Sequence, residues 1–186
     1  MASFDLTAFD ARHQQDIRLV AALENKKDAD NRTQIQIGFW INDPEQAIIY
    51  PQLDENLLGK RQDYLWQNTC FELFIGIREL DDYREINLAT NLTWQAYAFE
   101  EYRYPEKMPP QAANDIEVID IQRTKFGLTA LIDIQDFLNH FQISLNDIYF
   151  GVSAVIQTQQ KEHYFALQHS GQQADFHNKR DWLAYL

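Results

Sequence analysis

The chain has 186 residues, with 28 acidic and 16 basic side chains and a formal net charge of -12 at pH 7. This acidic excess argues against nucleic acid or an anionic membrane surface as the main partner, because both attract positively charged proteins. The single cysteine, Cys70, excludes an internal disulfide framework and any multi-cysteine metal site, and no apolar run approaches the roughly 20 residues of a membrane span.

No repeat, low-complexity tract or linker divides the sequence, so we expect one domain over residues 1–186. Residues 1–10 contain two acids and lack the basic and apolar segments of a secretory signal, which favours a cytoplasmic protein. The stretches 42–63 and 104–113 carry all five prolines. We expect both to form long surface loops, where functional residues are often found.

Apolar and polar residues alternate with a period of two along much of the chain. Residues 33–41 place Ile35, Ile37 and Phe39 on one face. The same alternation continues in residues 71–77, 116–122, 126–134 and 148–158. This pattern is typical of β-strands whose two faces meet different environments. The short intervals 78–82 and 124–125 predict hairpin turns.

The whole pattern predicts about nine or ten strands, with short helical candidates only at 134–142 and near the end of 175–186. No βαβ rhythm is present. We therefore predict an all-β fold, an antiparallel β-sandwich of immunoglobulin or jelly-roll type with one or two short helical turns.

Polar side chains interrupt strands that otherwise look buried. Glu72 lies in the middle of one strand, and Glu85 and Asn87 share a face of the next. A carboxylate on a half-buried strand costs several kcal/mol unless it is paired or hydrogen-bonded. Two interpretations remain: these groups and Arg103 satisfy one another on a solvated or ion-paired face, or they face a ligand.

Nearby aromatic residues favour a carbohydrate as that ligand. Sugar rings stack their C–H faces on Trp and Tyr, while Glu, Asn and Arg bind the ring hydroxyls. Trp40, Trp66 and Trp94 are the candidate platforms, and Tyr97 follows Trp94 on its strand. Each of them, taken singly, also fits an ordinary core or edge aromatic.

Histidines gather near the C-terminus, where His163, Tyr164, His169, Asp175 and His177 fall within fifteen residues. Three imidazoles and a carboxylate are groups that can ligate zinc or iron, and His169 and His177 can coordinate a haem. The spacing matches no specific metal motif. The alternative is a loop in which Asp175 caps backbone amides and His177 hydrogen-bonds a carboxylate.

Catalytic patterns are weaker than binding patterns. Cys70 lies inside a strand pattern, where a buried thiol behaves as a small hydrophobe. Glu72 and Glu85 form a glycosidase-like pair only if their carboxyl groups flank a bond. No nucleophile elbow, phosphate loop or dinucleotide-binding glycine pattern is present. A binding protein is therefore favoured over an enzyme.

Several short runs form a recognisable series. Residues 65–74 read LWQNTCFELF, and they are followed by YREIN at 83–87, WQAYAF at 94–99, Tyr102-Arg103, YFALQH at 164–169 and ADFH at 174–177. In this order the runs resemble the signatures of bacterial DOMON-like proteins, which are related to the family-nine carbohydrate-binding modules.

The resemblance implies a β-sandwich whose relatives bind sugars or haem as non-catalytic modules, some with structural calcium, although no calcium loop can be placed here. We expect a small-molecule ligand, a carbohydrate or a related polar metabolite. The expected ligand-binding residues are Trp66, Glu72, Glu85, Asn87, Trp94, Tyr97, Arg103, Tyr164, His169, Asp175 and His177. The alternatives are a haem-binding redox domain, a metal-dependent hydrolase that uses the C-terminal histidines, and a structural face that serves protein contact.

The chain departs from the family pattern at three places. Between residues 87 and 94 the usual Pro and Gly are absent, and Asn91 is expected to supply the left-handed turn residue. Phe165 stands where Trp is common, and Ala174 replaces the proline before Asp175.

Overall fold

The computed structural model describes residues 1–10 and 16–186, and this part of the chain forms ten strands with one α-helix, α1 (Gln135–Phe141). The strands are β1 (Ala2–Ala8), β2 (Arg18–Lys27), β3 (Thr33–Asn42), β4 (Cys70–Ile77), β5 (Tyr83–Ala89), β6 (Trp94–Phe99), β7 (Glu117–Thr124), β8 (Gly127–Asp133), β9 (Ile148–Gln157) and β10 (Glu162–Ala166). Short 3-10 turns are η2 (Glu55–Leu57), η3 (Leu65–Gln67), η4 (Leu145–Asp147) and η5 (Lys179–Asp181).

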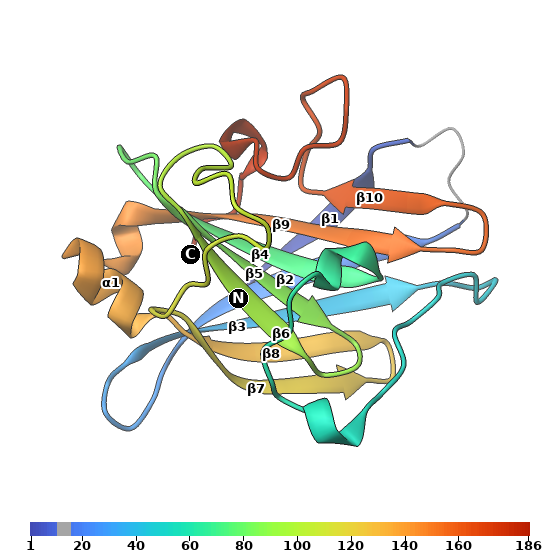
Figure 1. Ribbon diagram of the computed structural model, residues 1–186, viewed down its shortest axis with the longest axis horizontal. Coiled ribbons are helices and arrows are strands. Elements are labelled where there is room, and N and C mark those ends of the chain that lie inside the picture. The colour runs from blue at the N-terminus through green and yellow to red at the C-terminus, as the bar shows by residue number, and fades with distance from the viewer. Residues whose placement is uncertain (11–15) are drawn as a thin grey trace.

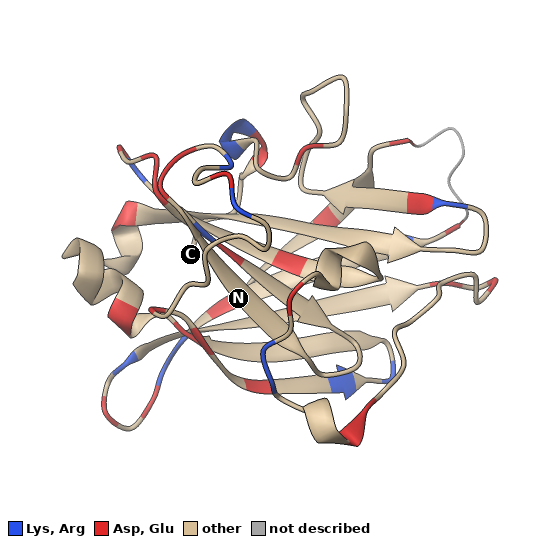
Figure 2. Cartoon of the chain, in the orientation of Figure 1, with Lys and Arg blue, Asp and Glu red and all other residues tan. Residues whose placement is uncertain are grey.

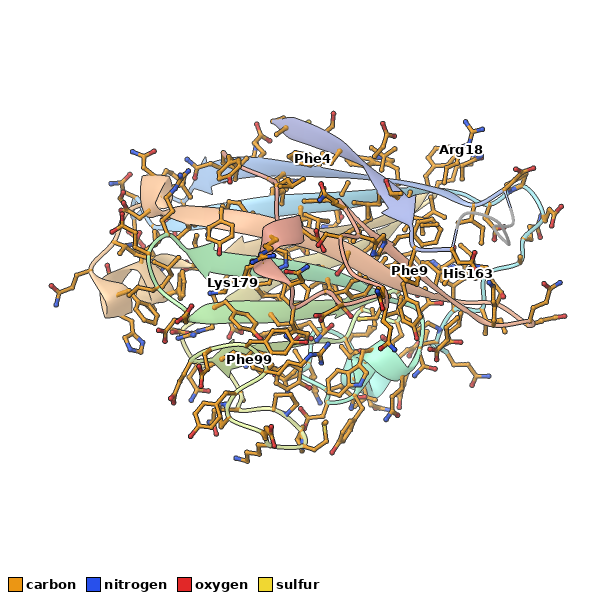
Figure 3. The ribbon with its side chains drawn as sticks, turned by 90° about the horizontal axis from the view of Figure 1, so that it is seen from above. Phe4, Phe9, Arg18, Phe99, His163 and Lys179 are labelled. Carbon is orange, nitrogen blue, oxygen red and sulfur yellow. The ribbon has the colours of Figure 1, made fainter. Side chains whose placement is uncertain are left out.

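All ten strands belong to one antiparallel sheet in the order β6-β5-β4-β9-β10-β1-β2-β3-β8-β7 (Figure 1). Strand β1 joins its two halves, because residues 2–6 pair with β2 while Thr7 and Ala8 pair with β10. The sheet bends at this junction, and Figure 3 shows β1–β3 in one layer above β4–β6 in another. The all-β prediction is confirmed. A sandwich of two separate sheets is not, because shared hydrogen bonds at β1 make the sheet continuous and barrel-like.

The period-two segments of the sequence correspond to β3, β4, β7, β8 and β9, with ends that differ by one or two residues. The interval 78–82 is the β4–β5 hairpin connection. The helical candidate at 134–142 contains α1, and the C-terminal candidate contains η5. Local alternation thus identified these strands.

The main core fills the space between the two halves of the sheet. Phe39 on β3 meets Phe71 on β4, with ring centroids 4.9 Å apart, and Leu73 and Ile75 are fully buried beside them. Each large apolar side chain buried in this way contributes about 1.5–3 kcal/mol. This layer fixes which residues of β4 and β5 point outward.

The outward face of β4 and β5 is buried as well. Every residue of both strands is buried, because loops and the C-terminal segment cover this face. A second cluster, made of Phe74, Tyr83, Tyr97, Phe99 and Trp182, packs there. Trp182 approaches β9 so closely that a Cβ added to Gly151 would lie 2.4 Å from its Cδ1 atom, so the absent side chain is what admits the indole.

Charged residues lie mostly on loops and strand ends, and only a few stand within the strands (Figure 2). Within the described ranges, no helix has the length and apolarity needed to cross a membrane.

Candidate functional site

A cleft of about 770 Å³ lies over the outward face of β4, β5 and β10. The segments 105–110 and 174–177 form two of its walls, and Trp66 of η3 borders it. Its lining comprises Trp66, Gln67, Glu72, Glu85, Phe99, Arg103, Pro105, Glu106, Lys107, Met108, Pro110, Val155, Glu162, Tyr164, Ala174, Phe176 and His177. Five stretches of the chain therefore converge on one opening.

Two buried carboxyl groups line this cleft from adjacent strands. Glu72 pairs with Asn87 across β4 and β5, whereas Glu85 pairs with Phe74, so the two glutamates are diagonal neighbours on one sheet face. Their exposed fractions are only 3% and 6%. Ser153 Oγ donates to Glu72 Oε2 at 3.1 Å, and Asn87 Nδ2 donates to Glu85 Oε1 at 2.7 Å.

Neither carboxyl group forms an ion pair with a Lys or Arg of the described residues; the nearest basic group is His177, whose Nε2 lies 3.5 Å from Glu85 Oε2. Burial raises the pKa of Glu72 well above its ordinary value, and the neighbouring Glu85 adds to this rise. Burial also raises the pKa of Glu85 to about 7, against opposing effects of Asn87 and Arg103. The pair therefore retains a proton near neutral pH.

His177 is held by the hydroxyl of Tyr83, which lies 2.7 Å from His177 Nδ1. The same hydroxyl accepts the backbone N–H of Arg103 at 3.1 Å, so its own proton is available to Nδ1. Burial, with a smaller contribution from Arg103, lowers the pKa of His177 to about 3. The imidazole is thus neutral, and its Nε2–H faces Glu85.

An ion pair stands at the rim of the cleft. Arg103 Nη2 donates to Asp175 Oδ1 at 3.0 Å, and Tyr102 Oη donates to Asp175 Oδ2 at 2.9 Å. The backbone N–H of His177 also donates to Asp175 Oδ1, at 3.2 Å. Although burial alone would raise the pKa of Asp175, the hydrogen bonds from Arg103 and Tyr102 lower it. This arrangement matches the predicted alternative in which Asp175 caps an amide and His177 meets a carboxylate.

Aromatic rings form the other walls. Phe99 stacks on Tyr83 with centroids 4.7 Å apart and an interplanar angle of 9°, and Figure 3 shows Phe99 on the side of the sheet where the loop after β6 lies. Tyr164 and Phe176 meet edge to face with centroids 6.0 Å apart. Trp66 contacts the Tyr97 ring edge to face at 5.5 Å. These rings provide flat apolar surfaces beside the two carboxyl groups.

Six of the predicted residues line the cleft: Trp66, Glu72, Glu85, Arg103, Tyr164 and His177. Three others support them from behind. Asp175 holds Arg103, Asn87 holds Glu85, and Tyr97 packs under Trp66 while its hydroxyl donates to Asp63 Oδ1 at 2.9 Å. Asn87 also accepts the Cys70 thiol, at 3.4 Å. Burial raises the pKa of Cys70, as expected for a structural thiol.

The prediction for Trp94 is wrong. Trp94 and Tyr97 are three residues apart on β6, so their side chains point to opposite faces of the sheet. Trp94 belongs to the main core with 2% exposure, and its Nε1 donates to Gly59 O at 3.0 Å. Trp40, the third candidate platform, is 41% exposed on β3 and does not line the cleft.

His169 does not reach the cleft lining either. Its Nε2 lies 2.9 Å from Thr7 O, and its ring packs against Phe9. At the β5–β6 turn, Leu92 rather than Asn91 has the positive φ, 65°. Asn91 instead accepts the Thr93 hydroxyl through its side chain, at 2.7 Å, so it stabilises the turn in another way.

Some residues that line the cleft were not predicted from the sequence to bind a ligand. Phe99 lies two residues after Tyr97 on β6 and thus on the same face, a signal that strand periodicity carried. The loop 104–113 was expected to be functional, and five of its residues line the cleft. Phe176 had no such signal, because its position depends on how the C-terminal segment docks. The other suspected loop, 42–63, contributes instead to a separate cavity of about 490 Å³ beside Arg123.

Two of the three imidazoles, those of His169 and His177, contact protein atoms, whereas His163 is buried with no hydrogen-bond partner at Nε2 among the described residues. His177 directs Nδ1 at Tyr83 and Nε2 at Glu85, and His169 directs Nε2 at Thr7 O. This arrangement does not fit axial ligation of haem by the two rings. In the described part of the chain, no group of three or more His, Cys, Asp or Glu side chains is placed to hold a metal ion.

The sequence matches no known family model and no curated protein. The fold, however, is similar to that in the crystal structure of a candidate carbohydrate-binding protein from Bacteroides uniformis, with a TM-score of 0.64 and 11% sequence identity. The similarity covers 98% of this chain and 84% of that one. At this identity the comparison establishes a shared β-rich fold.

Proposed function

We propose that this protein is a non-catalytic binding domain whose ligand, a carbohydrate or a closely related polar metabolite, occupies the cleft over β4, β5 and β10. The observation that carries the proposal is the pair of buried carboxyl groups, Glu72 and Glu85, that lines an open cleft between aromatic walls.

The cleft suits a small saccharide in size and in chemistry. Its volume of about 770 Å³ lies within the range of roughly 300–1,000 Å³ of small-molecule sites. Trp66, Tyr164 and Phe176 offer rings on which a sugar C–H face can stack, and the carboxyl oxygens offer acceptors for its hydroxyl groups. The mixture of flat apolar surface and fixed polar atoms is what a pyranose requires.

The supporting residues are arranged so that the polar atoms hold their positions before a ligand arrives. Asn87 fixes Glu85, Ser153 fixes Glu72, and Tyr83 fixes His177. Side chains ordered in advance lower the entropic cost of binding. The structural neighbour from Bacteroides uniformis supports the same class of function, and a DOMON-like sandwich related to the family-nine modules remains part of this proposal.

The test is a saccharide screen that also checks for chemistry. Calorimetric titration with mono- and disaccharides, alongside a glycan array, is expected to show binding at millimolar concentration or below. Mass spectrometry of each saccharide after prolonged incubation is expected to show no cleavage. Absence of binding across the whole panel contradicts the proposal, and cleavage that requires both Glu72 and Glu85 contradicts its non-catalytic part.

A further inference from the structure

One oxygen of the Glu72 carboxyl group accepts a hydrogen bond from the protein, and the other accepts none from the described residues. Ser153 donates to Oε2, and no donor among the described residues reaches Oε1. Glu72 is only 3% exposed, and yet it lines the cleft. Oε1 is not among the fully buried side-chain atoms that lack a partner in the described residues, so it is open to the cleft, where a ligand donor can reach it.

Glu85 presents a second incomplete carboxyl group on the same face. Asn87 satisfies Oε1, but Oε2 has only the long 3.5 Å contact to His177 Nε2. The guanidinium of Arg103 is already engaged by Asp175 and Tyr102 at the rim. The floor of the cleft therefore holds two acids with no cation of their own among the described residues.

The wider lining is also acidic. Glu106 and Glu162 add to Glu72 and Glu85, against Arg103 and Lys107 as the basic side chains. The groups that face the two glutamates from the packed elements are Tyr83, Arg103, Glu106, Lys107, Glu162, Asp175, His177 and the Cys70 thiol. With Arg103 paired to Asp175 and His177 neutral, acidic groups outnumber the available basic groups of the lining, which favours a cationic ligand over an anionic one.

From this geometry we infer that the ligand carries a positively charged amine, as an amino sugar does, and that its ammonium group binds the carboxyl groups of Glu72 and Glu85; the inference rests on the proposed carbohydrate-binding function. An ammonium group has three N–H donors and no acceptor, which suits the free Glu72 oxygen, the free Glu85 oxygen and one further acceptor. A neutral hydroxyl has only one hydrogen to donate.

Binding of such a ligand displaces the proton that the glutamate pair retains. Without ligand, at pH 6, Glu85 is mainly protonated because burial raises its pKa to about 7. The amine arrives with its own positive charge, so the carboxyl proton is released to the buffer and the ammonium replaces it. A neutral sugar has no such effect and leaves the number of bound protons unchanged.

The experiment compares matched sets of ligands on the wild-type protein. Each set contains a neutral hexose, the corresponding 2-amino sugar and its N-acetyl derivative, in the gluco, galacto and manno series. Calorimetry at pH 6, in two buffers with different ionisation enthalpies, measures affinity and proton release together. In at least one set, we expect the amino sugar to bind at least tenfold more tightly than the neutral hexose and the N-acetyl derivative. Its binding is expected to release close to one proton from the protein per ligand bound.

Charge-neutral variants of the same volume localise the effect. E72Q and E85Q are expected to lose at least tenfold in affinity for the amine and to abolish or sharply reduce proton release. E45Q, an exposed position outside the cleft, is the matched control and is expected to bind as the wild type does. Thermal melting shows whether each variant is folded, and proton release by the wild type tests the inference without any variant.

The possible failures are distinct. If neutral or N-acetylated sugars bind as tightly as the amines, or if amines bind without proton release, the amine inference is wrong while carbohydrate binding stands. If no saccharide of any class binds, the proposed function itself is wrong, and the inference with it.

Discussion

The Nε2 atom of His177 lies 3.5 Å from Oε2 of Glu85, and this contact joins the C-terminal segment to the middle of β5. The Glu85 side chain is buried and the His177 side chain is 12% exposed, and both are held by a second partner, Tyr83 for His177 and Asn87 for Glu85. The pair thus links the wall of the cleft to its floor, and its protonation affects stability as well as binding.

The stability of the protein is expected to fall with rising pH because of Glu85. Its folded-state pKa is raised to about 7 from the ordinary 4.5. The folded state therefore binds more protons between these values, and the stabilising contribution is full below pH 4.5 and lost as pH rises through 7. Between pH 4.5 and 7.5, the free energy of unfolding of the wild type, measured with urea, is expected to fall by about 3 kcal/mol relative to that of E85Q. A difference that stays constant with pH contradicts this expectation.

Tyr83→Phe removes the hydroxyl that holds both His177 and the backbone of Arg103. Because two part-buried hydrogen bonds are lost, we expect a loss of about 1–3 kcal/mol in the free energy of unfolding. Tyr164→Phe is the matched control, since the Tyr164 hydroxyl contacts only Glu162 at an exposed site, and we expect a change within about 0.5 kcal/mol. Equal losses of unfolding free energy in the two variants, measured by chemical denaturation, would show that the Tyr83 hydroxyl contributes no more to stability than an exposed hydroxyl does.

The three tryptophans considered from sequence are expected to respond differently to substitution. Trp66→Ala removes a cleft wall and is expected to weaken saccharide binding while the fold persists. Trp94→Ala empties a core position and is expected to cost about 3–5 kcal/mol of stability. Trp40→Ala is the binding control, because Trp40 lies on β3 outside the cleft. Calorimetry and thermal melting separate these outcomes, and a binding loss in Trp40→Ala would point to another site.

Gly151→Ala is expected to dislodge the C-terminal segment. The new Cβ would lie 2.4 Å from Trp182 Cδ1, so the indole must move, at a cost of about 1–3 kcal/mol. Trp182→Leu alone is also destabilising because it empties the outer cluster. The double variant is expected to be more stable than the sum of the single losses predicts, since the clash is gone. Simple additivity in denaturation experiments would argue against a direct Gly151–Trp182 constraint.

The sequence predicted the strands well because their signal is local. Alternation within residues 33–41 and 71–77 needs no knowledge of the partner strand, and it identified the apolar face of β3 and β4. Glu72 and Glu85 were found for the same reason, as polar residues that interrupt this pattern. The continuity of the sheet was not predictable, because it depends on two residues of β1, Thr7 and Ala8, that pair with a strand far along the chain.

The composition of the site was only partly predictable, for related reasons. The error at Trp94 came from counting it with Tyr97 although an odd separation places them on opposite faces. The contact between Tyr83 and His177 joins residues 94 positions apart, and no local pattern indicates it. Phe176 likewise enters the cleft from the C-terminal segment, where Trp182 packs against Gly151 and donates its Nε1–H to Phe176 O.

The most direct test of the account is a nuclear magnetic resonance titration of the isotope-labelled protein with the tightest-binding saccharide of the panel. We predict that the Trp66 indole and the backbone amides of Glu72, Glu85 and His177 shift with ligand, while the Trp40 indole stays unchanged. Shifts concentrated around Trp40 or the cavity beside Arg123, or none with any saccharide, would contradict the claim that this cleft binds sugar.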